Sequence, residues 1–209
     1  MERVIRAQIK GTSAQEVEEL FLDKWKGNEI SVGDCILLET FQSLLSLSMS
    51  CCGLKTLQVF PRLQRLETLE LSDNKLSGRL EPLANLTTLL KLNLAGNRIS
   101  SMSEVEVLAP TETSGLKNIV SLDLFDCPVT KAENYRERIF TMFPTLQILD
   151  GANREGEECT LTEQEEEESD EDVDLEGFID DSEESGSVKR SRESDTDESP
   201  PSKRQHLES

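Results

Sequence analysis

The chain has 209 residues, of which 42 are Asp or Glu and 22 are Lys or Arg, giving a formal net charge of −20. This length allows one domain with a tail or two small domains. The acidic balance argues against direct binding of a nucleic-acid backbone, which needs clustered Lys and Arg, and it favours basic partners instead.

The charge is distributed unequally along the chain. Residues 151–209 hold 22 Asp or Glu and 6 Lys or Arg, a net of −16. The remaining 20 acids and 16 bases leave residues 1–150 with a net of −4. We therefore predict a folded domain over residues 1–151, followed by an acidic tail over residues 152–209 whose apolar content is too low for it to fold.

The cysteine content and the hydropathy indicate where the protein resides. The five cysteines are an odd number without disulfide-like spacing, which predicts reduced thiols and an intracellular protein. The first residues form no apolar signal segment, and the chain has no run of about 18 apolar residues. We expect neither secretion nor a membrane span.

The first residues predict a short amphipathic helix. Val4, Ile5 and Ile9 recur at helical spacing among basic residues, and Gly11 would end the helix. A stack of repeats exposes an apolar end unless something covers it. We therefore predict that residues 1–10 form an N-terminal cap.

Five segments then fit, with varying strictness, the pattern L-x-x-L-x-L-x-x-N-x-L of a leucine-rich repeat. Their second leucines are Leu20, Leu47, Leu69, Leu92 and Leu122, at spacings of 27, 22, 23 and 30 residues. The longest spacing indicates a loop insertion at residues 109–114. Each repeat predicts one short strand, so the fold class is α/β, a solenoid with a parallel concave sheet.

The asparagine position of the repeat predicts a structural role. Asn74 and Asn97 occupy it in two repeats, and Cys52 and Cys127 replace asparagine in two others. A buried backbone group without a partner is costly. We expect the Asn74 and Asn97 side chains to hydrogen-bond the backbone of the turn that follows the strand, and we expect Cys52 and Cys127 to fit the same position as small structural substitutes.

The end of the domain predicts a C-terminal cap. Tyr135, Ile139 and Phe143 share one face of a predicted helix, which Pro144 ends, and a half-repeat follows at residues 146–151. The frame Tyr135-Arg136-x3-Phe140-x3-Pro144-x-Leu146-x2-Leu149-Asp150 resembles the cap shared by several nuclear leucine-rich-repeat families.

Two further segments narrow this resemblance. One is residues 122–130, which Asn134-Tyr-Arg-Glu137 follows, and the other is Glu70-Leu-Ser-Asp-Asn74. The acidic tail is a third shared feature. Together they resemble the acidic leucine-rich nuclear phosphoprotein family over residues 1–151. The resemblance implies a nuclear protein, and it implies a repeat domain that inhibits a type-2A protein phosphatase or acts as an RNA-export adaptor. A spliceosomal or scaffold repeat protein with the same cap is a further alternative.

Catalysis and metal binding find no support in the residues. The only histidine is His206, near the end of the tail, so the folded part offers no Ser-His or Cys-His pair. Cys51 and Cys52 are neighbours and do not form a Cys-x-x-Cys pair, and no glycine-rich phosphate loop occurs. The sequence predicts a protein that is not an enzyme and holds no cofactor or metal, and we expect a monomer.

The outward positions of the predicted strands carry carboxylates and two aromatic rings, which suit a basic partner; the alternative is a face that is only solvated. The predicted concave-face contacts are Glu19, Phe21, Glu70, Asp73, Asp123, Phe125 and Asp126.

The tail predicts a second binding segment, in which apolar residues stand among carboxylates. Charge would steer a basic protein such as a histone, and the apolar side chains would add burial on contact. The protein would then be a histone chaperone or a mask over histone tails; the alternative is a tail that only keeps the protein soluble. The predicted tail contacts are Glu165, Glu166, Glu167, Glu168, Asp170, Glu171, Asp172, Asp174, Leu175, Phe178, Ile179, Asp180 and Asp181.

Two further features of the tail predict nuclear regulation. Basic clusters at Lys189, Arg190, Arg192 and at Lys203, Arg204 are typical of a bipartite nuclear localisation signal. We expect localisation in the nucleus, with shuttling to the cytoplasm as an option. The candidate phosphorylation sites are Ser169, Ser182 and Ser199.

Overall fold

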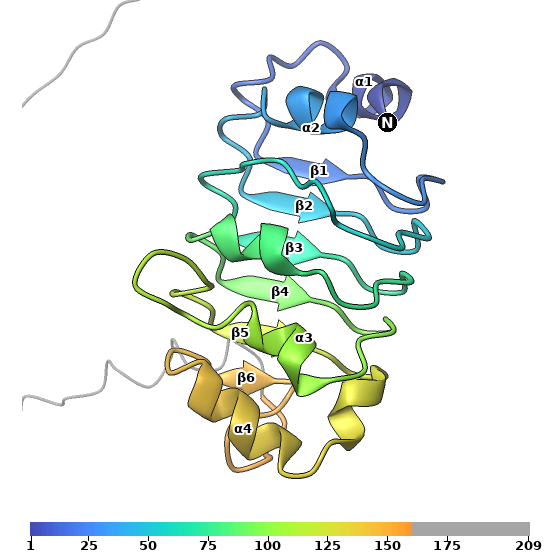
Figure 1. Cartoon of the computed structure of the whole chain (residues 1–209). Coiled ribbons are helices and arrows are strands. Elements are labelled where there is room, and N and C mark those ends of the chain that lie inside the picture. The colour runs from blue at the N-terminus through green and yellow to red at the C-terminus, as the bar shows by residue number, and fades with distance from the viewer. Residues whose placement is uncertain (160–209) are drawn as a thin grey trace, which may run out of the picture. The chain divides into compact units, whose positions relative to one another are not determined.

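The computed structural model describes residues 1–159. Six short parallel strands stack in chain order and form one sheet (Figure 1). The strands are β1 (Glu19–Phe21), β2 (Ser46–Ser48), β3 (Thr68–Glu70), β4 (Lys91–Asn93), β5 (Ser121–Asp123) and β6 (Ile148–Leu149). The predicted α/β solenoid with one strand per repeat is confirmed, and the half-repeat at the end supplies the sixth strand.

The register follows the repeat pattern. Leu20 pairs with Leu47, Leu47 with Leu69, Leu69 with Leu92, and Leu92 with Leu122. Leu149 continues the series on β6. These central leucines are all buried in one continuous core between the sheet and the return paths. The spacing of the leucines in the sequence thus fixes both the strand centres and the inner face of the sheet.

The return paths on the convex side differ from one repeat to the next. They carry α2 (Val32–Leu38), the 3-10 helix η1 (Glu81–Asn85), α3 (Met102–Glu106), the 3-10 helix η2 (Pro128–Lys131) and α4 (Tyr135–Met142). Figure 1 shows α2, α3 and α4 in front of the sheet. The return path between β2 and β3, which the structure describes in full, contains no helix.

The asparagine position behaves as predicted. The Asn74 side chain accepts a hydrogen bond from the Leu54 N–H and donates to the Met49 and Leu71 carbonyls, at 2.9–3.0 Å. It therefore joins its own turn to the preceding repeat. Asn97 makes the equivalent set of bonds one repeat further on.

The two cysteines in this position make fewer bonds. The Cys52 thiol donates to the Leu22 carbonyl and the Cys127 thiol to the Leu94 carbonyl, each at 3.2 Å. Burial raises the pKa of Cys52 to about 11, so the thiol keeps the proton that it donates. The predicted structural role of both cysteines is confirmed.

The N-terminal cap is α1 (Glu2–Ile9), as the spacing of the apolar residues predicts. Ile5 packs into the core, whereas Val4 remains partly exposed. The Gln8 side chain accepts a hydrogen bond from the Phe21 N–H at 3.0 Å and donates to the Phe21 carbonyl. Since β1 is the edge strand, this amide supplies partners that a further strand would otherwise provide.

The C-terminal cap is built around α4. Tyr135, Ile139 and Phe140 are buried, and the helix ends directly before Phe143 and Pro144. The Arg136 guanidinium donates to carbonyls of residues 149, 152 and 153, and it lies 5.3 Å from the centre of the Phe140 ring. Described structure continues through residues 152–159, where isolated bridges join Leu149 with Ala152 and Ala152 with Glu158.

The long spacing between the fourth and fifth repeats accommodates α3 and the predicted loop. Within this loop, Thr111 and Ser114 hydrogen-bond each other through backbone and side chain. Gly115 follows with a φ of +94°, and a Cβ there would lie 2.1 Å from the Ala109 carbonyl oxygen, so this turn requires glycine. All predicted tail contacts, the basic clusters and the phosphorylation sites lie beyond residue 159, outside the described residues, and stay predictions.

Candidate protein-interaction surface

The parallel register aligns the outward side chains of neighbouring strands in rows. One row, which we name the central row, consists of Phe21, Ser48, Glu70, Asn93 and Asp123. A second row runs alongside it and consists of Glu19, Ser46, Thr68, Lys91 and Ser121. Neighbouring strands lie about 4.8 Å apart, so Glu70 and Asp123 are about 10 Å apart along the central row.

Glu70 lies near the middle of the central row and is half-buried. Burial raises the pKa of its carboxyl group above the usual 4.5, and the negative charges of Asp123 and Asp23 raise it further. A hydrogen bond from Asn93 acts in the opposite direction. A carboxylate in this position gains from an approaching cation, because the cation replaces lost hydration and offsets the repulsion between acids.

Two exposed phenylalanines lie far apart along the sheet, one on the edge strand β1 and one just after β5. Phe21 is 51% exposed on β1, and Phe125, which follows β5 by two residues, is 67% exposed. Strands β1 and β5 are four strand spacings apart, or about 19 Å. Aromatic rings with this much exposed surface offer apolar contacts on either side of the carboxylates.

Asp73 and Asp126 do not lie in the central row. Both have a left-handed backbone conformation, with φ of 55° and 57°, in the turn that follows the strand. They occupy the same place in their repeats, directly before Asn74 and Cys127. The structure therefore separates the predicted contacts. Phe21, Glu70 and Asp123 share the central row, and Glu19 lies in the second row. Asp73 and Asp126 lie outside both rows, in the turns that follow β3 and β5.

Two other carboxylates near this face accept hydrogen bonds from groups of the domain itself. Asp23 accepts hydrogen bonds from the Ser48 hydroxyl at 2.5 Å and from the Ser50 N–H at 2.8 Å. Asp150 accepts from the Leu124 N–H at 2.7 Å and from the Tyr135 hydroxyl at 3.0 Å. Burial raises the pKa of Asp150.

Asp23 and Asp150 stabilise the turns beside the concave face. Neither residue is among the contacts predicted from the sequence. Each follows a strand within two residues, so the repeat frame is the signal that points to them. Asp23 belongs to the first repeat and Asp150 to the half-repeat of the C-terminal cap.

Within residues 1–159, no ion pair involves a carboxylate of the central row. Over residues 1–159, the ion pairs are those of the N-terminal amine with Asp34 and of Arg6 with Glu2. Both lie near α1 and α2, away from Glu70 and Asp123. The concave face therefore offers two carboxylates that have no cationic partner in the described part of the chain.

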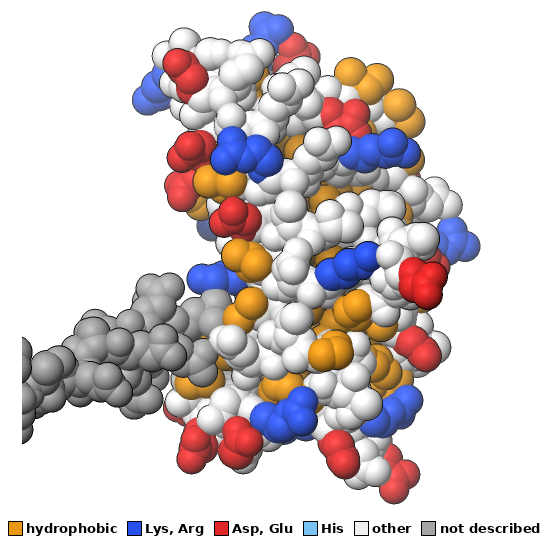
Figure 2. Space-filling model, turned by 90° about the vertical axis from the view of Figure 1, so that its left-hand side faces the viewer, with side chains coloured by type: hydrophobic (Ala, Val, Ile, Leu, Met, Phe, Trp, Pro, Cys, Tyr) orange, Lys and Arg blue, Asp and Glu red, His pale blue; other side chains and the backbone are white. Residues whose placement is uncertain are grey.

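Two other features are absent from residues 1–159, the part of the chain that the structure describes. In this part of the chain, no group of three His, Cys, Asp or Glu side chains is placed to hold a metal ion. None of its helices is both long and apolar enough to cross a membrane. Figure 2 shows basic, acidic and hydrophobic side chains interspersed over the side of the domain on which the strands begin.

The sequence of the chain is similar to known proteins at two levels. A protein-family model described as leucine-rich repeat matches residues 9–166. Two proteins named acidic leucine-rich nuclear phosphoprotein 32 family member A, from Drosophila melanogaster and Drosophila pseudoobscura pseudoobscura, are 41% and 40% identical over 158 and 159 residues. Each alignment covers 76% of this chain and 57% of the relative, so the chain spans little more than half the length of these relatives.

A solved structure agrees with the fold. The crystal structure of the Drosophila melanogaster SNF/U2A′ complex contains a chain that is 27% identical, with a TM-score of 0.53. The match covers 70% of this chain and 77% of that chain.

The stacked strands, the asparagine bonds and the open concave face define a leucine-rich repeat solenoid, a class of domain whose extended face binds other proteins. The chain belongs to the leucine-rich repeat family, and over 76% of its length it is similar to proteins named acidic leucine-rich nuclear phosphoproteins. The resemblance noted in the sequence is thereby confirmed, and so is the assignment to the nucleus.

Proposed function

We propose that this nuclear interaction protein is not an enzyme and that it binds histones, either as a chaperone or as a mask over histone tails. The observation that carries the proposal is the central row, in which Glu70 and Asp123 form no ion pair within residues 1–159. Exposed Phe21, at one end of this row, and Phe125, two residues after β5, add apolar surface. Lysines and arginines of a histone would pair with the carboxylates. Its apolar side chains would pack on the rings.

The two parts of the chain would contribute differently. The net charge of −16 in residues 151–209 would speed the approach of a basic protein and weaken with added salt. The half-buried Glu70 would be screened less by salt, since it lies in a less polar environment than the tail. In this mechanism the tail sets the rate of association and the concave face adds selectivity.

The test of the concave face is a double substitution, Glu70→Gln with Asp123→Asn, in the full chain. Histone binding, measured by fluorescence anisotropy with labelled core histones, should weaken about tenfold, since each lost charge pair contributes roughly 0.5–1 kcal/mol. The matched control is Glu106→Gln with Glu137→Gln, which removes the same charge from exposed helix positions. Equal affinity of the wild type and the Glu70–Asp123 double variant would refute a role for the concave face.

The tail requires a separate experiment. A peptide of residues 160–185 should bind core histones, with affinity that falls as salt is added and falls again in the Phe178→Ala peptide. If the affinity is unchanged in both comparisons, the apolar residues of the tail do not act as anchors.

A second candidate function is a repeat domain that acts by itself, as an inhibitor of a type-2A protein phosphatase or as an RNA-export adaptor. The similar solved structure is that of the SNF/U2A′ complex, and a repeat domain found in a complex supports a function in protein binding. Deleting residues 160–209 separates the candidates. The adaptor function predicts that the main interaction survives the deletion, whereas histone binding should lose most of its salt-dependent part.

A further inference from the structure

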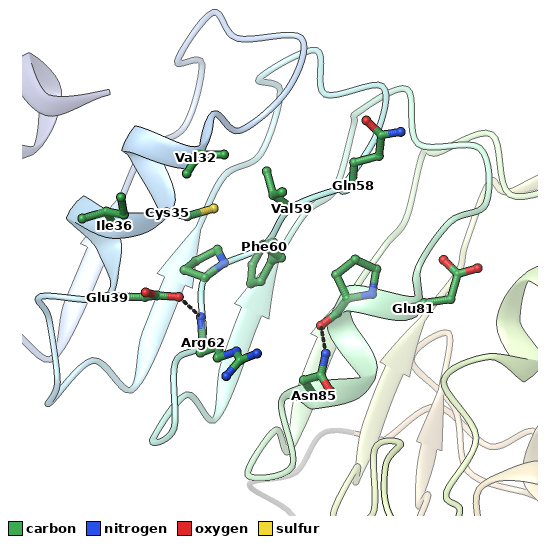
Figure 3. A pocket seen from close by; sticks show the side chains of 12 residues that line it. Val32, Cys35, Ile36, Glu39, Gln58, Val59, Phe60, Arg62, Glu81 and Asn85 are labelled. Carbon is green, nitrogen blue, oxygen red and sulfur yellow. Dashed lines mark hydrogen bonds between the residues drawn. The ribbon is translucent and has the colours of Figure 1, made fainter.

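The convex face has an opening where one return path lacks a helix. The return path between β1 and β2 contains α2, and the return path between β3 and β4 contains η1. Between them, residues 58–62 run as a non-helical segment, so a groove of about 530 Å³ separates the two helices. Figure 3 shows α2 on one side of this groove, the segment behind it, and η1 on the other side.

The groove is lined by apolar side chains that the domain itself does not cover. Val32 and Ile36 lie one turn apart on α2 and are 64% and 63% exposed. Val59 is 38% exposed beside them, and Phe60 and Pro61 belong to the intervening segment. Surface apolar side chains usually occur singly, so this cluster marks a binding surface.

The walls of the groove are held in place before any partner arrives. The Arg62 N–H donates to the Glu39 carboxylate at 2.9 Å, which ties the segment to the end of α2 (Figure 3). Pro61 and Pro82 fix the backbone on two sides, since proline restricts φ. A partner would meet a formed groove and would not need to order it, which lowers the entropic cost of binding.

The charges around the groove are mainly negative. Glu39 stands beside α2 and Glu81 stands on η1, and both are exposed, while Arg62 is the cation among the lining residues. Arg62 points its backbone N–H, rather than its guanidinium, at Glu39. An apolar partner with basic side chains at its flanks therefore fits this surface better than an acidic one.

We propose that this groove binds an amphipathic helix of a protein partner, with aliphatic side chains on one face and Lys or Arg at its flanks. The helix would complete the convex layer where the return path between β2 and β3 supplies none. A helix-in-groove contact places apolar residues at i, i+3, i+4 and i+7, and such a row of side chains could pack against Val32, Ile36 and Val59. The site is separate from the concave face and does not depend on the proposed histone binding.

Two other occupants fit less well. Twelve residues line the groove, whereas a stable protein interface uses about 20–30 residues a side, so a second copy of the chain would bury too little here. The apolar residues Leu175 and Phe178 of the chain's own tail stand among Asp174, Glu176 and Asp180, whose charges would meet Glu39 and Glu81. A basic helix meets neither obstacle.

The test uses the full chain and a synthetic helix-stabilised peptide of about 13 residues, long enough for three to four turns. Its leucines lie on one face and its remaining positions are lysine. Binding is measured by fluorescence anisotropy at about 0.3 M salt, which shortens the range of attraction to the acidic tail. Three variants are compared: Ile36→Ser in the groove, Val107→Ser after α3 as the matched control, and the Glu70–Asp123 double variant.

We expect Ile36→Ser to weaken peptide binding about tenfold, a loss that corresponds to about 1.4 kcal/mol. Val107→Ser, which changes an apolar residue that is 36% exposed outside the groove, should leave the affinity within about twofold. The Glu70–Asp123 double variant should bind as the wild type does, so failure of this proposal and failure of the histone proposal are distinguishable. Methyl NMR shifts on peptide addition should centre on Val32, Ile36 and Val59.

Several results would overturn the proposal. A peptide of the same composition with its leucines spread around the helix should bind weakly. If it binds as tightly as the peptide with leucines on one face, the groove does not recognise an apolar helix face. A glutamate version that binds as tightly as the lysine version refutes the charge argument. If the wild type sediments as a dimer and Ile36→Ser sediments as a monomer, the groove binds a second copy of the chain. An affinity gain of about tenfold on deleting residues 160–209 would assign it to the tail.

Discussion

On the concave face, β1 to β5 each present two outward side chains at a spacing that the sheet fixes, whereas on the convex face the return paths differ in length and in helix content. The regular spacing makes the concave face a continuous row of polar and charged groups. The irregular return paths leave gaps, and one of them is the groove between α2 and η1. Two surfaces of one domain thus suit different partners: an extended basic surface on the concave side and a short amphipathic helix with basic flanks on the convex side.

The two faces share the asparagine bonds that hold successive repeats in register. Removing them should disturb both faces at once, whereas substitutions on either surface should act on that surface alone. Substitutions of the asparagines should therefore have larger effects than substitutions on either face.

Asn97→Ala should lower the free energy of unfolding by about 3–4 kcal/mol, since about four hydrogen bonds of roughly 1 kcal/mol each are lost inside the core. Chemical denaturation monitored by circular dichroism measures this change. Asn97→Cys is the matched control, because Cys52 and Cys127 show that a thiol retains one bond in this position. We expect Asn97→Cys to recover part of the loss, and equal stability of Asn97→Ala and the wild type would contradict the shared role.

Leu38→Ala and Ile36→Ala compare the two sides of α2. Leu38 is fully buried, so its truncation should cost about 2–5 kcal/mol in the free energy of unfolding. Ile36 is 63% exposed, and its truncation should change the free energy of unfolding by less than about 0.5 kcal/mol. Thermal unfolding of both variants checks this. A large loss of stability for Ile36→Ala would show that Ile36 serves the core, which would weaken the assignment of the groove as a binding surface.

Glu70→Gln tests the concave face through its pH dependence. The folded state holds the Glu70 proton more tightly than the unfolded chain, whose pKa is near 4.5. The contribution of Glu70 to the free energy of unfolding is therefore highest below pH 4.5 and falls as the pH rises to the folded pKa. At pH 7, Glu70→Gln should stabilise the domain by about 0.5 kcal/mol, a small effect typical of a surface position.

The stability difference between Glu70→Gln and the wild type should disappear below the unfolded pKa, which denaturation at several pH values measures. Glu106→Gln, which removes the same charge from an exposed position at the end of α3, is the matched control. A difference between Glu70→Gln and the wild type that grows as the pH falls would contradict the raised pKa.

The repeat domain itself was largely predictable. The strand centres, the parallel sheet, the bonds of Asn74 and Asn97 and both caps follow from residue spacing, because each is a local pattern repeated at a fixed period. The rows of the concave face were predictable for the same reason. Asp73 and Asp126 were grouped with Glu70 in the sequence, and their left-handed turn separates them from it. This separation depends on backbone angles that the repeat pattern leaves open.

The amino-acid sequence by itself determined the solenoid and the family, since leucines at a repeat period can be buried together in few other ways. It also determined which side chains face outward on each strand, because alternation along a strand is fixed. Only the tertiary structure decided where a helix is missing from the convex layer and which apolar side chains this leaves exposed. In the sequence, Val32, Ile36 and Val59 are apolar residues outside the repeat pattern. In the structure they line a groove, because the return path between β2 and β3 contains no helix that covers them.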